Sequence, residues 1–394
     1  MKADFPLRLL PGNRLHLLQS GAEYFPALIA AIDAARIEIH LETYIFEDDG
    51  TGRAVAAALG RAARRGVAVR VLVDGFGARR FAEGLGIPLR EAGAEVLVYR
   101  PEAGRLVFRR NRLRRLHRKL SVFDGALAFV GGINVIDDNN TPHQIPPRFD
   151  YAVRIEGPLV PAIHFAVRHL WRLVRWSRIG RRPPPPPGLH VAPPSADGPV
   201  SAGLLIRDNL RHRRDIENAY MEAITNARRE VLIANAYFLP GKRFRRALTD
   251  AAARGVRVTL LLQGRVEYVL LHYATLALYG ILLRAGIRIV EYRASFLHAK
   301  VAVIDDDWAT VGSSNIDPFS LLLAREANVV VRNAGFAAGL RASLEAAMAA
   351  GGHPVSHADL RARPWYVRAA SRLAYNFVRL LMGVTGYVRR PRKR

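Results

Sequence analysis

The sequence predicts an α/β protein made of two tandem α/β/α sandwich domains related by a pseudo-twofold axis. Three observations lead to this fold class: the same order of elements occurs twice, predicted helices alternate with apolar strands, and a proline-rich segment separates the two copies. A repeat of this kind determines the architecture. Alternating helices and strands favour mixed or parallel sheets with helices on both faces.

The first copy begins with a predicted helix and continues into a predicted strand. Four apolar residues recur at the spacing of one helix face, namely Phe25, Leu28, Ile29 and Ile32. Residues 34–39 then lead to Tyr44, and residues 227–232 repeat this pattern before Tyr237. The repeat therefore aligns Tyr44 with Tyr237.

Two further segments recur in the same order, and a linker divides the copies. Residues 63–69 recur as 252–258 and residues 92–99 recur as 285–292, each as helix, glycine turn and strand. Five consecutive prolines at 183–187, with a Pro/Ser-rich run after them, predict a stiff, extended linker. We expect an N-terminal domain at 1–180, the linker at 181–200, a C-terminal domain at 201–350 and a basic amphipathic tail at 351–394.

The composition limits the partners of the chain. With 59 Lys+Arg against 34 Asp+Glu, the formal net charge is +25, which favours an anionic partner such as nucleic acid or acidic lipid. The sequence contains no cysteine, which excludes disulfides, thiolate nucleophiles and cysteine metal sites. The N-terminal residues lack the pattern of a signal peptide, which favours the cytoplasm. The longest uncharged stretch, at 268–283, is shorter than the ~20 residues of a spanning helix, so we predict no transmembrane helix.

The most specific signal is a motif that occurs once in each half. His117, Lys119 and Asp124 form the pattern His-x-Lys-x4-Asp, and His298, Lys300 and Asp305 repeat it. A single such motif in a basic protein is usually a solvated strand edge or a core histidine, but two copies in matching contexts favour catalysis. The apolar residues within each motif indicate a buried strand, so the histidine and lysine share one face. We expect both sets to converge on one phosphate, in a single active site at the domain interface.

These residue types suit phosphodiester exchange. The reaction needs a nucleophile, a proton donor for the leaving alkoxide and positive charge around the transition state. One histidine attacks phosphorus and forms a phosphohistidine, the other acts as general acid and base, and the lysines place fixed charges on phosphate oxygens. Asn134 and Asn315 follow the two motifs at the same distance and add amide donors for the phosphate. No metal and no cofactor are expected.

Acidic and aromatic residues near the motifs complete the set of candidates. A nucleophilic imidazole needs an acceptor at its second nitrogen. Asp150 and Glu326 are candidates because they begin similar apolar strands, 33 residues after His117 and 28 residues after His298. Asp124 and Asp305 count as candidate catalytic residues, although their position before turns favours a structural role. Glu42, Tyr44 and Tyr237 either line the cleft or pack in the core or at the rim.

At these residues the sequence resembles the phospholipase D superfamily, whose two His-x-Lys-x4-Asp motifs lie across a pseudo-dimer interface. Within it, the sequence is similar to bacterial cardiolipin synthases of the shorter B type; the segments that carry the resemblance are 116–120, 129–134, 295–300 and 311–318. The resemblance implies transfer of a phosphatidyl group between two phosphatidylglycerol molecules, or from another phospholipid to a glycerol-type acceptor, without a metal. We favour His117 as the nucleophile. The apolar run at 321–324 replaces a polar residue that is common in such relatives, which leaves the acceptor open.

Three segments suggest contact with a membrane. Residues 105–119 carry seven arginines and one lysine without an acid, a pattern that gains roughly 1 kcal/mol per charge at an anionic leaflet. In the tail, Leu373, Phe377, Leu380, Leu381 and Val384 share one helix face beside arginines, as in interfacial helices. Residues 268–283 either line an acyl-chain entrance or form a core helix. We expect peripheral attachment to the cytoplasmic face of the cell membrane and an anionic phospholipid as partner, and we leave the oligomeric state open.

Other functions compete with this interpretation. A hydrolytic phospholipase D differs only in using water to resolve the intermediate. A nucleic-acid phosphodiesterase would suit the charge, but aromatic residues are not regularly interleaved with the basic runs as in single-strand binders, so no nucleic acid is expected. A binding module without activity would not need the histidine, lysine and asparagine in both copies.

Overall fold

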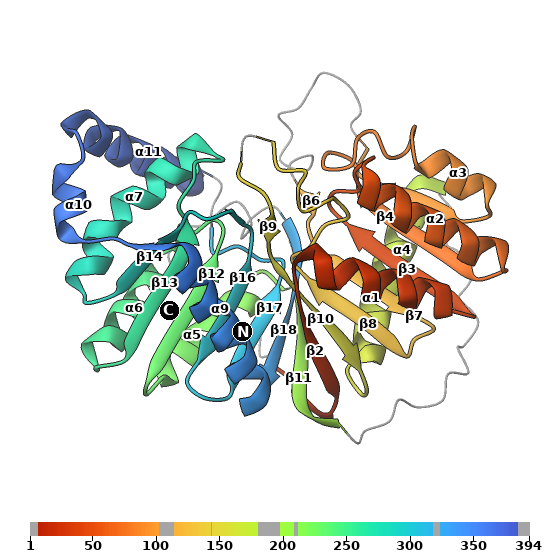
Figure 1. The fold of residues 1–394 in the computed structure, drawn as a ribbon, viewed down its shortest axis with the longest axis horizontal. Helices are drawn as coiled ribbons and strands as arrows, with labels where there is room; N and C mark the ends of the chain where they lie inside the picture. Colours follow the sequence, from red (N-terminus) through yellow and green to blue (C-terminus); the bar gives the residue numbers. More distant parts are fainter. Residues whose placement is uncertain are drawn as a thin grey trace, which may run out of the picture.

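The computed structural model describes residues 7–101, 114–142, 144–179, 198–208, 212–317 and 324–384. Two sheets lie side by side, each covered by helices (Figure 1). The prediction of an α/β protein with two sandwich domains is confirmed. Most of the predicted linker, most of the basic segment at 105–119 and the basic end of the tail lie outside the described residues.

The first half of the chain forms a seven-stranded sheet. Its strand order is β2 (Arg14–Gln19), β10 (Tyr151–Glu156), β8 (Leu127–Gly131), β7 (Lys119–Phe123), β3 (Glu38–Thr43), β4 (Ala68–Asp74) and β5 (Glu95–Tyr99). The last three strands are parallel to one another, and the other pairs are antiparallel. One face packs against α1 (Ser20–Ala34), α2 (Gly50–Arg64) and α3 (Gly86–Glu91), and the other packs against α4 (Val160–Ile179). The predicted stripe of α1 faces the sheet, with Phe25, Leu28 and Ile32 buried.

The second half repeats this arrangement in a larger sheet. Its path is β1 (Leu10–Gly12), β11 (Gly198–Arg207), β18 (Ala324–Arg332), β17 (Trp308–Gly312), β16 (Lys300–Ile304), β12 (Glu230–Asn235), β13 (Arg257–Gln263), β14 (Arg288–Tyr292) and β19 (Gly352–Pro354). The helices are α5 (Asp215–Asn226), α6 (Lys242–Ala253), α7 (Val269–Arg284) and α9 (Ala334–Gly351). Helices α5, α6 and α7 share one core cluster, and α9 packs in another with residues of the first sheet.

One hydrophobic core crosses the boundary between the halves. Tyr151 and Val153 from the first sheet pack in the same cluster as Val301 and Val329 from the second, and all four are fully buried. Each buried aliphatic side chain contributes about 1.5–3 kcal/mol, so this cluster fixes the two sheets relative to each other. Residues from both halves can therefore hold fixed positions along this boundary.

Strand registers define which residues of the two halves are equivalent. Ile39 pairs with Phe123, four residues after Lys119, and Val231 pairs with Ile304, four residues after Lys300. Ile39 is therefore equivalent to Val231, which makes Tyr44 equivalent to Ala236 rather than to Tyr237. The sequence alignment of the two tyrosines is wrong by one residue. Such a shift moves a side chain to the opposite face of a strand.

The chain ends are more closely tied to the fold than the predicted domain limits suggest. Strand β1 comes from the first predicted domain but pairs with β11 in the second sheet. Within the predicted tail, β19 pairs with β14, and α10 (His357–Ala362) and α11 (Trp365–Val384) follow. Helix α11 lies against α7 at the upper left of Figure 1. The described part of the tail thus belongs to the second domain.

Helix α11 is apolar on its exposed side. Ser371 and Val378 are buried against the protein, whereas Leu373, Phe377, Leu380 and Leu381 are 38–70% exposed. The start of α7 and the residue before it also expose apolar side chains, namely Tyr268, Val269 and Leu270. In the described ranges, no helix combines the length and the apolar character needed to span a bilayer.

Candidate active site

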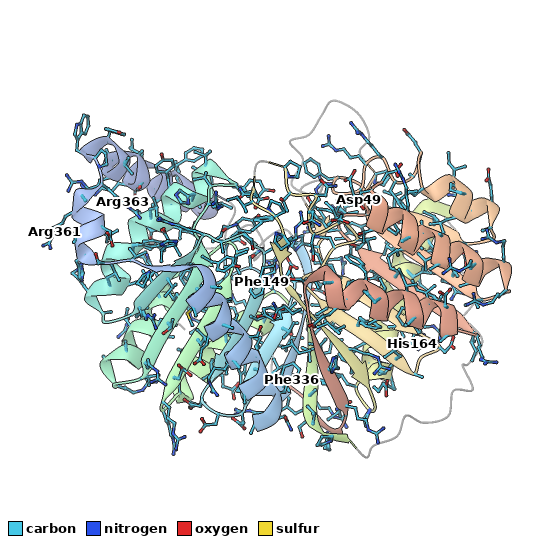
Figure 2. The ribbon with its side chains drawn as sticks, in the orientation of Figure 1. Asp49, Phe149, His164, Phe336, Arg361 and Arg363 are labelled. Carbon is cyan, nitrogen blue, oxygen red and sulfur yellow. The ribbon has the colours of Figure 1, made fainter. Side chains whose placement is uncertain are left out.

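Both histidines of the repeated motif lie where the two halves meet. Each follows a two-residue strand that pairs in parallel with the other half: β6 (Arg115–Leu116) beside β18, and β15 (Phe296–Leu297) beside β9 (Arg148–Phe149). His117 N donates to Arg325 O at 3.0 Å, and His298 N donates to Phe149 O at 2.8 Å. Figure 2 labels Phe149 at this boundary. Each motif is therefore positioned by the opposite half.

A carboxylate from the opposite half holds each imidazole. His117 Nδ1 lies 3.0 Å from both carboxylate oxygens of Glu326, and His298 Nδ1 lies 2.6 Å from Asp150 Oδ2. The sequence identified both acids, but their spacing linked each one to the histidine of its own half, and the structure exchanges the partners. Since a carboxylate at Nδ1 orients the ring, Nε2 of each histidine is the atom directed to reactants.

The two motif lysines bring positive charge to the same place. Lys119 Nζ donates to His117 O at 2.7 Å, and Lys300 Nζ lies 3.3 Å from Asp150 Oδ2 and 2.8 Å from His298 Nδ1. Both side chains are almost completely buried, with 4% and 0% exposure. Buried ammonium groups need anions nearby. Asp150 and Glu326 meet part of this need, and a phosphate between the lysines would meet it further.

Burial and mutual repulsion lower the pKa of the basic groups in this site. Burial lowers the pKa of His298 to about 3, with the Lys300 ammonium adding to the effect and Asp150 opposing it. Burial also lowers the pKa of His117, with Glu326 opposing the shift. Lys119 has its pKa lowered by burial to about 7. A bound phosphodiester adds negative charge and would raise all three pKa values.

The two carboxylates sit in different surroundings. Burial raises the pKa of Glu326, but His117 and Lys119 outweigh it and hold this pKa below its usual value. Ser313 Oγ also donates to Glu326 Oε2 at 2.6 Å. At the equivalent position Gly132 has no side chain, and a Cβ there would collide with the carboxylate of Asp150. Ser313 is a site residue that the sequence analysis missed, although the aligned segments 131–134 and 312–315 show a serine opposite a glycine.

The two asparagines are buried but bonded differently. Asn134 Oδ1 accepts a hydrogen bond from Ile45 N at 3.1 Å. In the second half, Ile316 N, next to Asn315, donates to Asn235 Oδ1 at 3.2 Å. Asn315 Oδ1 is buried without a hydrogen-bond partner in the described structure, unlike Asn134 Oδ1. A role for either amide in phosphate binding stays a prediction.

Asp124 and Asp305 lie away from the cluster of histidines, lysines and acids. Each connects the end of its motif strand to the backbone at the start of the neighbouring strand. Asp124 accepts hydrogen bonds from the backbone N–H groups of residues 36–38, and Asp305 accepts them from residues 228–230. Both residues have a positive φ, near 50°. Five strand steps separate Lys119 from Asp124, about 16 Å. This geometry contradicts a catalytic role for the two aspartates and favours the structural one.

The three possible cleft residues have three different positions. Tyr44 lies beside the site, with its ring 5.0 Å from the His117 ring. Glu42 is not in the cleft, because it is buried in an ion pair with Arg118, whose Nη2 also donates to Ala166 O of α4 at 3.0 Å. Tyr237 donates a short hydrogen bond to Glu267 and lines a hollow beneath α7.

One further cluster has the donor atoms of a metal site. Glu38, His40 and His164 bring possible ligand atoms within 4.8 Å of one another, between β3 and α4. Figure 2 labels His164 on the first half. Arg70 Nη1 already donates to Glu38 Oε2 at 2.8 Å and lies 3.4 Å from His40 Nε2. A cation so close opposes metal binding, so these residues form a buried polar cluster rather than a cofactor site.

Comparisons with known proteins agree with this geometry. The family described as "Cardiolipin synthase, PLD-like domain" matches the chain twice, over residues 28–146 and 220–348. Cardiolipin synthase B of Escherichia coli (strain K12) is 39% identical over 387 residues, which cover 96% of this chain and 90% of that protein. Major cardiolipin synthase ClsA of Bacillus subtilis (strain 168) is 32% identical over 323 residues, covering 81% of this chain and 65% of that protein.

A solved structure shares the fold at low sequence identity. Phosphatidylserine synthase of Haemophilus influenzae Rd KW20 superimposes with a TM-score of 0.64, covering 97% of this chain and 96% of that chain. The two sequences are 13% identical, so this likeness concerns the fold alone.

Proposed function

The chain belongs to the cardiolipin synthase family built on phospholipase D-like domains and is a phosphatidyltransferase, and from this premise we propose that phosphatidylglycerol is both its donor and its acceptor. One observation carries the mechanism: two imidazoles, each held at Nδ1 by a carboxylate of the opposite half, lie in one site with two buried lysines. The predicted superfamily and enzyme class are confirmed.

The first half-reaction forms a covalent intermediate. His117 Nε2 attacks the phosphorus of phosphatidylglycerol, and the bond from phosphorus to the glycerol oxygen breaks. His298 Nε2 gives its proton to that oxygen, so that free glycerol leaves and a phosphatidyl group stays on His117. Glu326, assisted by Ser313, stabilises the positive charge that develops on the attacking ring.

The second half-reaction transfers the phosphatidyl group. The terminal hydroxyl of a second phosphatidylglycerol gives its proton to His298 Nε2, and its oxygen attacks phosphorus while the bond to His117 breaks. Two phosphatidylglycerol molecules thus yield one cardiolipin and one glycerol. Lys119 and Lys300 stabilise the charge on the non-bridging oxygens in both steps, where buried charges act strongly.

Vesicle assays test the reaction. Purified full-length protein is incubated with phosphatidylglycerol vesicles, and the lipids and released glycerol are measured by mass spectrometry. We expect cardiolipin and glycerol in equal amounts. Phosphatidic acid in place of cardiolipin would identify a hydrolase. Unchanged lipid, together with cleavage of an oligonucleotide, would favour a nucleic-acid phosphodiesterase.

Peripheral attachment to an anionic membrane is part of the proposal. The exposed apolar side of α11 is supported by the neighbouring apolar end of α7, and Arg368, Arg372 and Arg379 lie on the same helix. An apolar face with adjacent arginines suits a helix that lies in the plane of the lipid headgroups. Attachment at the cytoplasmic face stays a prediction.

Substituting the exposed leucines tests the attachment. In L373S/L380S the loss of two apolar side chains is expected to weaken binding to anionic vesicles about 10²-fold or more, at about 1.5–3 kcal/mol for each full burial. Turnover of phosphatidylglycerol dispersed in detergent should stay near the wild-type value. The control Phe165→Ser changes a residue of α4 that is 72% exposed and should leave vesicle binding unchanged. Equal binding by all three proteins would refute a role for α11.

A further inference from the structure

The ends of β4 and β13 carry equivalent residues with different surroundings. Gly75 N donates to Tyr99 O and Gly264 N donates to Tyr292 O, both at 2.9 Å, so Asp74 is equivalent to Gln263. Asp74 is fully buried, and its carboxylate accepts hydrogen bonds from Leu116 N at 2.8 Å and from two amides of the following turn. Asp74 therefore positions the segment that leads to His117.

Gln263 does not have this role in the second half. Its side chain is 8% exposed, and in the described structure neither Oε1 nor Nε2 has a hydrogen-bond partner. Leaving a buried polar group unsatisfied costs about 1–3 kcal/mol. Because neither Oε1 nor Nε2 of Gln263 has a partner, we expect this amide to bind a ligand group that can both donate and accept hydrogen bonds.

A hollow lies in front of this amide. Its polar lining includes Gln263, Glu267, Tyr237 and His272, and α7 lies along one side. Ala236 also lines it, at the position equivalent to Tyr44 in the first half. Where the first half places an aromatic ring against His117, the second half thus has only a methyl group, which lines the hollow.

The hollow borders the catalytic strand of the second half. Ala236 N donates to Ala299 O at 2.9 Å, and Ala299 lies between His298 and Lys300. Burial raises the pKa of Glu267, while its hydrogen bond with Tyr237 and the charges of Lys300 and Arg148 oppose the rise. A ligand in the hollow would therefore lie beside the strand neighbouring the second motif, close enough to Lys300 for its charge to act on Glu267.

The lining selects neutral hydroxyl groups. A carboxylate at Glu267 repels a phosphate, and Arg265, the cation of the lining, directs its Nε to Arg293 O at 3.1 Å. Each hydroxyl of a polyol both donates and accepts, which matches an amide, a phenol and a carboxylate. Apolar groups alone could not satisfy these side chains.

The proposed reaction places a polyol at this location. In a double displacement, the leaving oxygen and the incoming oxygen occupy the same face of phosphorus, opposite the nucleophile, and share one acid and base. With His117 as nucleophile, that face is the one near His298. We propose that Gln263, Glu267 and Tyr237 bind a glycerol unit through its hydroxyls, first as the leaving glycerol and then as the headgroup of the accepting phosphatidylglycerol. This assignment rests on the proposed function.

Three products distinguish the sources of the glycerol unit. Phosphatidylglycerol vesicles are incubated with the full-length protein in buffer containing isotope-labelled glycerol. Cardiolipin reports a lipid headgroup as acceptor, labelled phosphatidylglycerol reports free glycerol, and phosphatidic acid reports water. In Gln263→Leu we expect the ratio of the first two products to phosphatidic acid to fall about 10- to 10²-fold, because two hydrogen bonds to the acceptor are lost at about 0.5–1.5 kcal/mol each. Loss of only one product assigns the pocket to that source.

A second substrate separates binding of glycerol from damage to the catalytic site. Phosphatidyl-p-nitrophenol has a leaving group without hydroxyls, so its initial rate of p-nitrophenol release should fall much less in Gln263→Leu than cardiolipin formation does. Glu267→Gln is an independent variant with the same expected order of effects. The control Gln19→Leu makes the same chemical change at β2, far along the chain from the pocket, and should keep the wild-type product ratio.

The outcomes keep the two proposals apart. Wild-type protein that releases no p-nitrophenol and makes no cardiolipin would overturn the proposed function itself. Active wild-type protein with an unchanged product ratio in both pocket variants would overturn the pocket. Equal losses of p-nitrophenol release and cardiolipin formation would also overturn it, because they would indicate a structural role for Gln263.

Discussion

The two halves of the molecule place the same motif on equivalent strands but surround it differently. In the first half, Tyr44 packs beside His117, and Asp74 holds the segment that leads to this histidine. In the second half, the equivalent residues are Ala236 and Gln263, and both line a hollow with polar side chains. The repeat thus supplies two similar sets of candidate catalytic groups, and the different residues around them support the different roles that we propose for the two histidines.

The two carboxylates that hold the imidazoles also have different surroundings. Glu326 accepts a hydrogen bond from the Ser313 hydroxyl, whereas the equivalent Gly132 has no side chain to offer Asp150. Asp150 instead accepts a hydrogen bond from Tyr151 N at 2.8 Å and lies 3.3 Å from Lys300 Nζ. His117 is therefore paired with a carboxylate that a hydroxyl supports, and His298 with a carboxylate that a lysine supports, a difference that fits the separate roles we propose for the two rings.

Replacing either histidine should reduce cardiolipin formation more than any other change, and the two variants distinguish the nucleophile from the proton carrier. We expect His117→Ala and His298→Ala each to reduce cardiolipin formation about 10⁴-fold or more, since each removes a group that acts directly in bond making or proton transfer. Only His298→Ala should still form a phosphohistidine from phosphatidyl-p-nitrophenol, because p-nitrophenolate leaves without a proton. Mass spectrometry of the quenched protein detects the adduct. An adduct on His298 in the His117→Ala variant would reverse the assignment.

The carboxylates should come next. Glu326→Gln and Asp150→Asn each remove the charge behind one imidazole, and we expect kcat to fall about 10²-fold, near the upper end of the 1.5–3 kcal/mol of a hydrogen bond to a charged group. With phosphatidyl-p-nitrophenol the Glu326→Gln variant should lose more activity than Asp150→Asn, because the proton carrier matters less for that leaving group. Equal losses with both substrates would contradict the division of roles.

The pH dependence of kcat/KM should report the protonation of the buried Lys119. Because burial lowers the pKa of Lys119 to about 7, the free enzyme loses this ammonium as the pH rises through 7, well below the usual pKa of a lysine. Above that pH we expect an added tenfold fall of kcat/KM per pH unit, and profiles from pH 5 to 9 measure it. Lys119→Arg keeps a charge throughout this range and should lose the inflection near pH 7 at a lower overall rate. An unchanged inflection in this variant would assign it to another group.

The smallest expected effect comes from the serine that distinguishes the two carboxylates. Ser313→Gly makes the second half resemble the first and removes the 2.6 Å hydrogen bond to Glu326. One hydrogen bond to a charged group is worth about 1.5 kcal/mol at the lower limit, so we expect kcat to fall roughly tenfold. The control Ser314→Ala changes the next residue, whose Oγ donates to Asn315 O at 3.4 Å, and should have little effect. Similar kcat values for wild type and Ser313→Gly would mean that Glu326 needs no such support.

The sequence by itself determined the repeat, the α/β layers, the histidines and lysines of the candidate active site and the two acids that hold the imidazoles. These features depend on local patterns: strand and helix periodicity, and a motif whose spacing is the same in both copies. The superfamily could be predicted for the same reason, because its signature lies within short segments.

Only the tertiary structure decided which groups meet. Glu326 bonds to His117 across 209 residues, and Asp150 bonds to His298 across 148, although each acid lies much closer in sequence to the other histidine. Glu42 faces Arg118 rather than the cleft, and Gln263 lacks the partners that Asp74 has. Such contacts depend on strand register and on the packing of one sheet against the other, which no local pattern records. Because the sequence alignment paired Tyr44 with Tyr237 rather than with Ala236, it did not reveal the hollow in front of Gln263.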